Sequence, residues 1–366
     1  MRATLASVVS VFWALTAAVA HPLVEKRGQC AATLSTALFI AETLQSHYFN
    51  TGNGQYNGGS LWTDANTLED LHNLMLATGT DEFAAVADQS FIGKSAQNSD
   101  TTHWNSILAG SNDDAGWVIL ALWKIADYKM ARGLDSSAYL ARQWDNTCGG
   151  GVWWSSAHTY KNAITNELFL LISATGAINF PSQTAFLNNA NLVWNWLKNS
   201  GMRNSAGLWN DGLTSDCQNN GQTTWTYNQG VIASGLSALA HVTGDTSLLT
   251  QAEITLDATI SLLTTNSILK ESCDDAAAGG PVCDADQVSW PSVQYYLDRA
   301  NDPARNAKYS GFLGSQSSAV YHYGTDAAGD VGSVWYAPNA GGSVFTPKSS
   351  ASGLEAHIAD AKYGPC

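Results

Sequence analysis

The stretch Ser111–Trp123 reads Ser-Asn-Asp-Asp-Ala-Gly-Trp-Val-Ile-Leu-Ala-Leu-Trp, a polar start followed by an apolar run. This pattern predicts the beginning of a buried helix, with Asp113 and Asp114 side by side in its first turn. Carboxylates in a first turn are common helix caps, because they interact favourably with the helix dipole. Two neighbouring carboxylates can also work as an acid/base or nucleophile pair, so residues outside this stretch have to distinguish the two roles.

The regions on either side of this stretch carry the same helical periodicity. Apolar residues recur at helical spacing, and strand-like alternation is confined to short pieces such as residues 151–154 and 207–209. We therefore predict an all-α protein. The predicted helices span residues 31–48, 61–77, 114–128, 162–174, 184–197, 227–242 and 248–263.

Three of these helices are followed by a Thr-Gly pair, with the glycine at position 79, 176 or 244. Glycine at this place is typical of a helix C-cap. A weak repeat of helical pairs without a linker predicts one closed toroid of about six helical hairpins rather than two domains. The Gly/Ser-rich region from residue 324 to 352 is the one stretch that suggests a long surface excursion.

The first 20 residues have the pattern of a cleaved secretory signal, with Arg2 followed by an apolar run and a small-residue end. Residues 21–27 end in the dibasic pair Lys26-Arg27, which predicts a short pro-segment. We expect a secreted, extracellular chain of residues 28–366 that forms a single domain. Its net charge is about −16, because removal of residues 1–27 takes three positive and one negative side chain from a chain of net charge −14.

The strongly acidic balance argues against nucleic acids and anionic membranes as partners, since both carry negative charge. Only 13% of the residues are charged, yet the chain contains 14 Trp and 13 Tyr. Aromatic rings pack against the C–H faces of sugars, and amide side chains bind sugar hydroxyls. The composition therefore favours an uncharged, hydroxyl-rich ligand. The aromatic residues could equally fill a core.

An even number of cysteines in a secreted chain suggests three disulfides, for which fifteen connectivities are possible. We predict a local bridge between Cys273 and Cys283, which bracket a flexible loop. A pair between Cys30 and Cys366 would join the first and last helices of a closed toroid. The remaining cysteines are Cys148 and Cys217.

The sequence contains no CxxC, no HExxH and no other histidine spacing typical of a metal site, so we expect neither a metal nor another cofactor. The polar C-terminus lacks the apolar tail of a lipid-anchor signal, and no run after the signal is long enough to cross a bilayer. We expect a monomer without a membrane anchor.

Clusters of polar and aromatic residues precede several of the predicted helices, at residues 61–66, 148–154, 160–167 and 225–230. In a toroid, the loops at one end of the inner helices form a groove, which these clusters would line. Helix capping and core packing explain some of the same residues. Besides the two aspartates, the candidate substrate-binding residues are Trp62, Asn66, Trp117, Trp153, Trp154, Lys161, Asn162, Asn166, Tyr227, Asn228 and Gln229.

Four ordered motifs make the chain resemble glycoside hydrolase family 76, the α-1,6-mannanases and related fungal cell-wall enzymes. The motifs are residues 112–114, 150–154, 160–168 and 227–230, and the similarity spans roughly residues 30 to 360. The resemblance implies an (α/α)6 barrel as the catalytic domain, a retaining mechanism, Asp113 as nucleophile and Asp114 as general acid/base. A retaining pair needs two carboxyls about 5 Å apart. Mutual repulsion would raise the pKa of the partner that donates the proton.

The resemblance thus implies a secreted, endo-acting α-1,6-mannanase that cuts the mannan backbone with retention of configuration. One alternative, from the same family, is a cell-wall transglycosidase that acts on mannan or on a GPI glycan. Another, from a different class, is a non-catalytic mannan-binding toroid. The intact Asp113-Asp114 pair favours an enzyme over a binding protein, and the lack of an apolar C-terminal tail favours the hydrolase over the transglycosidase.

Overall fold

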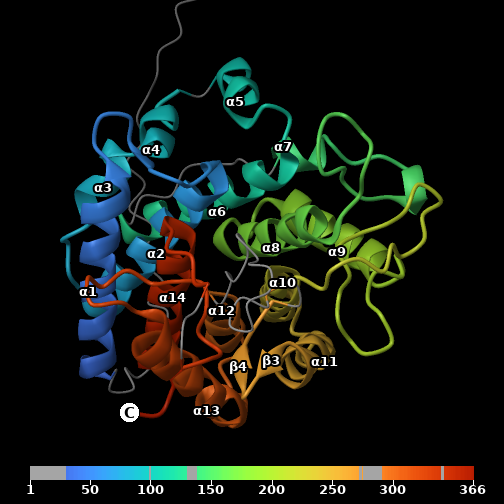
Figure 1. The fold of residues 1–366 in the computed structure, drawn as a ribbon. Coiled ribbons are helices and arrows are strands. Elements are labelled where there is room, and N and C mark those ends of the chain that lie inside the picture. Colours follow the sequence, from blue (N-terminus) through green and yellow to red (C-terminus); the bar gives the residue numbers. More distant parts are fainter. Residues whose placement is uncertain (1–29, 99, 130–137, 272–273, 275–290, 339–341) are drawn as a thin grey trace, which may run out of the picture.

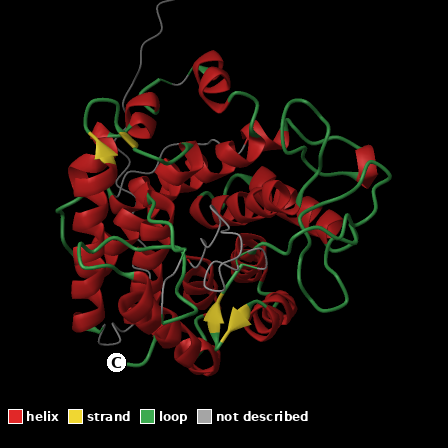
Figure 2. Cartoon of the chain, viewed as in Figure 1, coloured by secondary structure: helices red, strands yellow, loops and turns green. Residues whose placement is uncertain are grey.

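The computed structural model describes residues 30–98, 100–129, 138–271, 274, 291–338 and 342–366 (Figure 1). This part of the chain is mostly helical, and its named strands are two short hairpins (Figure 2). Antiparallel pairs join β1 (Phe49–Asn50) to β2 (Gln55–Tyr56) and β3 (Thr264–Thr265) to β4 (Ile268–Leu269). The predicted all-α class is confirmed.

Within the described residues, six helices form a closed inner ring in which each helix packs against the next. Contacts between the last and the first of them close the ring, as a toroid requires. In chain order they are α2 (Leu61–Thr78), α6 (Asn112–Tyr128), α8 (Ala163–Asn179), α10 (Thr226–Thr243), α12 (Pro291–Ala300) and α14 (Pro347–Tyr363).

The inner helices are buried on all sides over much of their length. Every residue of α8 from Ala163 to Ala174 is buried, and so is every residue of α2 from Thr63 to Met75. A helix surrounded by other helices does not need the polar face that a surface helix presents to water. Polar residues on these helices must therefore find partners inside the protein or line an opening.

A second layer of helices covers the inner ring. The longer ones are α1 (Ala31–Tyr48) on α14 and α2, α9 (Thr184–Leu197) on α8 and α10, α11 (Ser247–Leu262) on α10, and α13 (Pro303–Ala319) on α14 and α12. Shorter helices lie in the connections from α2 to α6 and on to α8, namely α3 (Ala84–Gln89), α4 (Phe91–Ser95), α5 (Thr101–Leu108) and α7 (Ala138–Ala141). A 3₁₀ turn lies at Thr147–Gly149 and a π-helical turn at Val320–Gly324. Among the ranges described above, none holds a helix with the length and apolarity to cross a bilayer.

Two disulfides lie in the described part of the chain. Cys30–Cys366 connects the residue before α1 to the end of the chain after α14, which confirms that predicted pair. Cys148–Cys217 links the loops that precede α8 and α10. Cys273 and Cys283 lie outside the described residues, so the bridge between them stays a prediction.

The glycine C-caps are confirmed at two of the three predicted places. Gly79 and Gly244 end α2 and α10 with left-handed φ angles of 77° and 74°. The prediction is wrong at Gly176, because α8 continues through it to Asn179. A Cβ at Gly176 would lie 2.2 Å from Cδ1 of Phe186, so glycine is needed there for close packing of α8 against α9.

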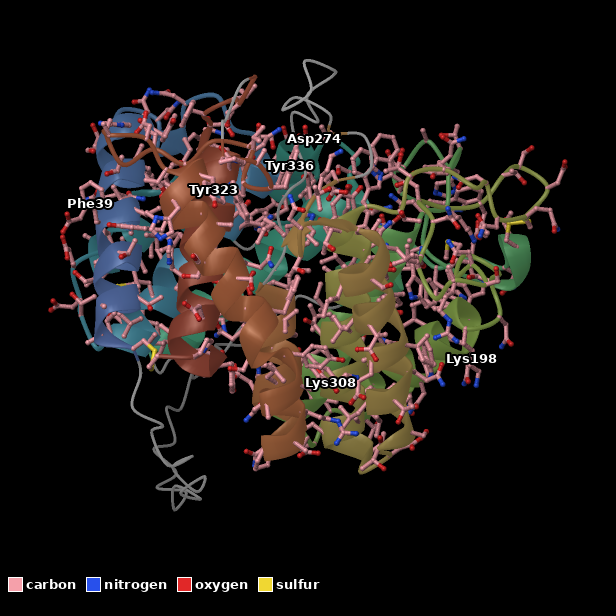
Figure 3. The ribbon with its side chains drawn as sticks, turned by 60° about the horizontal axis from the view of Figure 1, so that its bottom comes forward. Phe39, Lys198, Asp274, Lys308, Tyr323 and Tyr336 are labelled. Carbon is pink, nitrogen blue, oxygen red and sulfur yellow. A yellow bond between two sulfur atoms is a disulfide. The ribbon has the colours of Figure 1, made fainter. Side chains whose placement is uncertain are left out.

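The region from residue 324 to 352 is only in part the surface excursion that its composition suggests, because residues 331–336 are buried while residues 326–328, 344 and 345 are exposed. Val331, Trp335 and Tyr336 are buried, and α14 begins within the region at Pro347. The hydroxyl of Tyr336 donates to Oδ1 of Asp274 at 2.9 Å. Both residues are labelled in Figure 3. Small residues here allow the chain to pack closely, since a Cβ at Gly332 would lie 2.2 Å from Oγ of Ser343.

Candidate active site

A cleft with a volume of about 340 Å³ opens where α2, α6, α8 and α10 begin. Trp62 and Asn66 line it from α2, and Asp113 and Trp117 line it from α6. Each pair is four residues apart, a spacing that places two side chains on the same side of a helix. The other lining residues are Trp154, Tyr160, Asn162, Ile164, Asp211 and Tyr227.

The cleft brings together many of the residues predicted to bind substrate. Those that line it are Trp62, Asn66, Trp117, Trp154, Asn162 and Tyr227. Asn162 combines both roles considered for it, because it also caps α8 by accepting the backbone N–H of Thr165 at 3.4 Å. The lining contains no Lys or Arg side chain. The chemistry of the wall therefore suits a neutral ligand with many hydroxyls.

Asp113 is the predicted catalytic residue that lines the cleft. The Ser111 hydroxyl donates to its Oδ1 at 2.6 Å, and the indole N–H of Trp154 donates to its Oδ2 at 3.0 Å. The capping role belongs to Ser111, whose Oγ accepts the backbone N–H of Asp114 at 3.4 Å. Asp113 is thus not needed as a cap, and its carboxylate is held in place at the helix start, where the dipole favours negative charge.

Asp114 occupies a different environment from its neighbour. It is half-buried and does not line the cleft. Burial and the adjacent charge of Asp113 raise the pKa of Asp114 to about 6, although a hydrogen bond from Ser111 acts in the opposite direction. When two adjacent carboxyls lie in different environments, their pKa values differ, so one can be protonated and donate a proton while the other is ionised.

Lys161, which the sequence predicts to contact substrate, is not among the residues that line the cleft. It is buried, and its Nζ donates to Oδ1 of Asp145 at 2.6 Å and to the carbonyls of Thr147 and Gly150 at 2.7 Å. Trp153 donates its indole N–H to the same carboxylate, at Oδ2, 2.7 Å away. Partial burial opposes ionisation of Asp145, but the bonds from Lys161 and Trp153 prevail and lower its pKa to about 2.

Trp153 and Asn166 are likewise outside the lining, and Asn166 bonds to the backbone of the loop that carries Trp154. The side chain of Asn166 accepts from the backbone N–H of Val152 at 2.7 Å and donates to the carbonyl of Val152 at 3.0 Å. Asn166 is fully buried, so these two bonds satisfy a polar group that water cannot reach. Asn166 therefore holds this loop in place.

Asn228 and Gln229, also predicted to bind substrate, are fully buried and outside the lining. Gln229 repeats the bidentate arrangement of Asn166, with its Oε1 accepting the N–H of Trp209 at 2.8 Å and its Nε2 donating to the carbonyl of Trp209 at 2.9 Å. It thereby fixes the loop that leads to Asp211. The side-chain N and O atoms of Asn228 have no hydrogen-bond partner within the described residues.

Three lining residues were not among the candidate substrate-binding residues: Tyr160 and Ile164, which lie in the predicted cluster at residues 160–167, and Asp211, which lies outside every predicted cluster. The hydroxyl of Tyr160 donates to Oδ2 of Asp211 and accepts from the Asn220 side chain at 2.8 Å. Burial raises the pKa of Asp211, and the bonds from Tyr160 and Trp225 counteract the rise. Asp211 sits in a loop between α9 and α10, where Asn-Asp-Gly reads as an ordinary turn. No local signal separates it from other turn residues.

The described residues contain no group of three or more His, Cys, Asp or Glu side chains arranged to hold a metal ion.

A family model described as glycosyl hydrolase family 76 matches residues 33–297. Mannan endo-1,6-alpha-mannosidase DCW1 of Candida glabrata is 26% identical over 254 residues, which are 63% of this chain and 52% of the relative. Mannan endo-1,6-alpha-mannosidase DFG5 of Saccharomyces cerevisiae is 25% identical over 236 residues, which are 58% of this chain and 50% of the relative. The chain spans between about a third and a little over half of the length of the curated relatives that it matches.

Solved structures of low sequence identity share the fold. The α-1,6-mannanase GH76A of Salegentibacter sp. HEL1_6 has a TM-score of 0.72 at 20% identity, covering 90% of this chain and 99% of that chain. Dfg5 of Chaetomium thermophilum, in complex with glucosamine, has a TM-score of 0.77 at 16% identity, covering 92% of each chain. The inner ring and its outer layer form the predicted (α/α)6 barrel. Because the family model covers most of the chain, including the aspartate pair and the whole cleft lining, the chain belongs to glycosyl hydrolase family 76.

Proposed function

We propose that this protein is a secreted, endo-acting α-1,6-mannanase that hydrolyses mannan with retention of configuration. The observation that carries the proposal is the aspartate pair at the start of α6, with Asp113 in an aromatic-walled cleft and Asp114 half-buried beside it. Two curated relatives bear the name mannan endo-1,6-alpha-mannosidase. Variants of the Salegentibacter enzyme with two consecutive aspartates replaced are inactive and were solved with α-1,6-mannotriose and α-1,6-mannotetrose.

In the proposed first step, a carboxylate oxygen of Asp113 attacks the anomeric carbon while the glycosidic C–O bond breaks. Asp114 gives its proton to the departing sugar oxygen, and the product is a glycosyl ester of Asp113. In the second step, water attacks the anomeric carbon, Asp114 takes a proton from the water, and Asp113 leaves as a carboxylate. Asp114 does not line the cleft, so its half-buried side chain has to rotate toward the leaving oxygen.

The remaining lining residues supply binding. Trp62, Trp117, Trp154 and Tyr227 offer aromatic faces for sugar rings. The amides of Asn66 and Asn162 and the carboxyl of Asp211 can bind sugar hydroxyls. Ionised Asp211 accepts hydrogen bonds from such hydroxyls, and its bond with Tyr160 holds it in position.

The proposal is tested by incubating the purified protein with α-1,6-mannooligosaccharides and following the products over time. Shorter sugars indicate a hydrolase, longer sugars indicate the transglycosidase alternative, and unchanged sugars with retention on a mannan column indicate a binding protein. Proton NMR of the earliest product should show the α configuration. An initial β product would contradict the assignment of both roles to Asp113 and Asp114, because inversion needs carboxyls roughly 6.5–9.5 Å apart.

We also propose that the protein is extracellular and monomeric, with a processed N-terminus at Gly28. Culture-supernatant protein should give an N-terminal sequence that starts at Gly28, and light scattering should give the mass of one chain. Retention of Lys26-Arg27 in the secreted product would refute the pro-segment.

A further inference from the structure

The indole of Trp154 makes a contact that goes beyond stacking on a sugar ring. The residue lines the cleft and is 45% exposed, yet its N–H is turned to Asp113 and donates to Oδ2 at 3.0 Å. On the other side of the same carboxylate, the hydroxyl of Ser111 donates to Oδ1 at 2.6 Å. Each carboxylate oxygen thus accepts one donor, and the two donors together fix the orientation of the carboxylate plane.

The backbone around Trp154 keeps this donor in place. The backbone N–H of Asn112 donates to the carbonyl of Trp154 at 2.9 Å, and the Asn112 side chain donates to the carbonyl of Trp153 at 2.8 Å. The backbone N–H of Trp154 in turn donates to the carbonyl of Tyr160 at 2.8 Å. Because Asn112 directly precedes Asp113, the segments that carry the donor and the carboxylate are bonded to each other.

The strength of the bond from Trp154 changes during the proposed reaction. A hydrogen bond to a charged acceptor is stronger than one to a neutral acceptor. Asp113 is a carboxylate in the free enzyme, a neutral ester in the intermediate, and a carboxylate again when water releases the sugar. The bond therefore strengthens while the ester breaks, which lowers the barrier of that step. Each carboxylate oxygen has two lone pairs, so Oδ2 can accept the N–H and still bond the anomeric carbon.

We propose that the indole N–H of Trp154 is a positioning group, which orients the Asp113 carboxylate and speeds its release from the sugar. This role is separate from the aromatic face that Trp154 offers to the substrate. It rests on the proposed function, which makes Asp113 the nucleophile. Among the described residues, Trp62 and Trp117 line the same cleft but make no such bond to Asp113.

The first measurement checks the bond itself by NMR and needs no substrate. In protein labelled with ¹⁵N-tryptophan, the indole N–H signal that is missing from Trp154→Phe identifies Trp154. A hydrogen bond to a carboxylate moves an indole proton downfield, so this signal should move upfield in Asp113→Ala. Asp114→Ala, which removes the neighbouring carboxyl, should shift the same signal much less.

The second measurement compares the two steps of the reaction in Trp154→Phe, which keeps an aromatic ring but lacks the N–H. On an aryl α-1,6-mannobioside whose leaving group needs no protonation, release of Asp113 limits the rate. We expect this release to slow by about tenfold. The covalent intermediate should then accumulate, visible by mass spectrometry after rapid quenching, and kcat and KM should fall together. On mannotetraose, kcat should fall by less, because the bond weakens rather than strengthens while Asp113 attacks.

The matched control is Trp62→Phe, which makes the same replacement in the same cleft at a residue that does not bond to Asp113. It should raise KM for mannotetraose, because part of an aromatic face is lost, and it should not accumulate the intermediate. Trp154→Leu also lacks the N–H, and it should accumulate the intermediate and identify the NMR signal if Trp154→Phe does not fold.

A Trp154 signal that stays in place in Asp113→Ala would overturn the inference, and so would wild-type release of Asp113 in a folded Trp154→Phe or Trp154→Leu protein. The proposed function would still stand in either case, provided that wild-type protein cleaves mannotetraose and Asp113→Ala does not. Failure of wild-type protein to cleave mannotetraose, or full activity of Asp113→Ala, would instead refute the proposed function.

Discussion

Replacement of Lys161 by Met tests whether this buried lysine supports the loop or binds the substrate. The change keeps an unbranched side chain, one atom shorter, but removes the donor to one carboxylate and two carbonyls. A hydrogen bond contributes about 0.5–1.5 kcal/mol net, and a bond to a charged group about 1.5–3 kcal/mol. The side chain of Asp145 is 36% exposed, so water can solvate it after the change and its share must be discounted. The two bonds to carbonyls and the discounted bond to Asp145 together give an expected loss of about 3 kcal/mol in the free energy of unfolding.

For a domain of this size, a loss of about 3 kcal/mol lowers Tm by about 4 °C. Differential scanning calorimetry measures this change, and Lys198→Met is the matched control, because Lys198 is an exposed lysine at the end of α9 (Figure 3). We expect Lys161→Met to lower Tm and to reduce kcat through displacement of Trp154, while Lys198→Met changes neither. An unchanged Tm together with a raised KM for mannotetraose would show that Lys161 contacts the substrate, and would refute our argument.

The other predictions concern a proton donor, a close packing contact and a buried acid. Burial and the charge of Asp113 raise the pKa of Asp114 to about 6. If Asp114 is the acid, kcat/KM for mannotetraose should fall as pH rises above about 6, because the proton donor is lost. A flat profile from pH 5 to 8 would contradict this role of Asp114. Gly176→Ala should cost about 1–3 kcal/mol in urea unfolding because its Cβ meets Phe186, whereas Gly311→Ala, with no atom within 4 Å of its Cβ, should be neutral or slightly stabilising. Burial raises the pKa of Glu355 from 4.5 to about 8, so folding stability should fall as pH rises between those values, because Glu355 ionises in the unfolded chain while it stays protonated in the folded one. Glu355→Gln should reduce that fall, and an equally steep decline in the variant would exclude Glu355 as its source.

Local sequence patterns determined the helices and one part of the site. Apolar periodicity and end signals depend on residues within a few positions of each other, so the predicted bounds of residues 31–48 and 184–197 coincide with those of α1 and α9. The same patterns placed Asp113 and Trp117 one turn apart on one helix. Two residues on the same face at the start of an inner helix reach the cleft together, and this much follows from the sequence.

Tertiary structure alone decided which polar residues face the cleft. Lys161 and Asn162 are neighbours in the chain, yet one is enclosed by backbone carbonyls and the other lines the cleft. The bond from Trp154 to Asp113 crosses 41 positions, and the bond from Tyr160 to Asp211 crosses 51. Such contacts depend on how the inner helices and their loops come together in the closed barrel. The local sequence around each residue does not determine which distant segments meet. Only the folded chain therefore shows that Asp211 lines the cleft with Asp113.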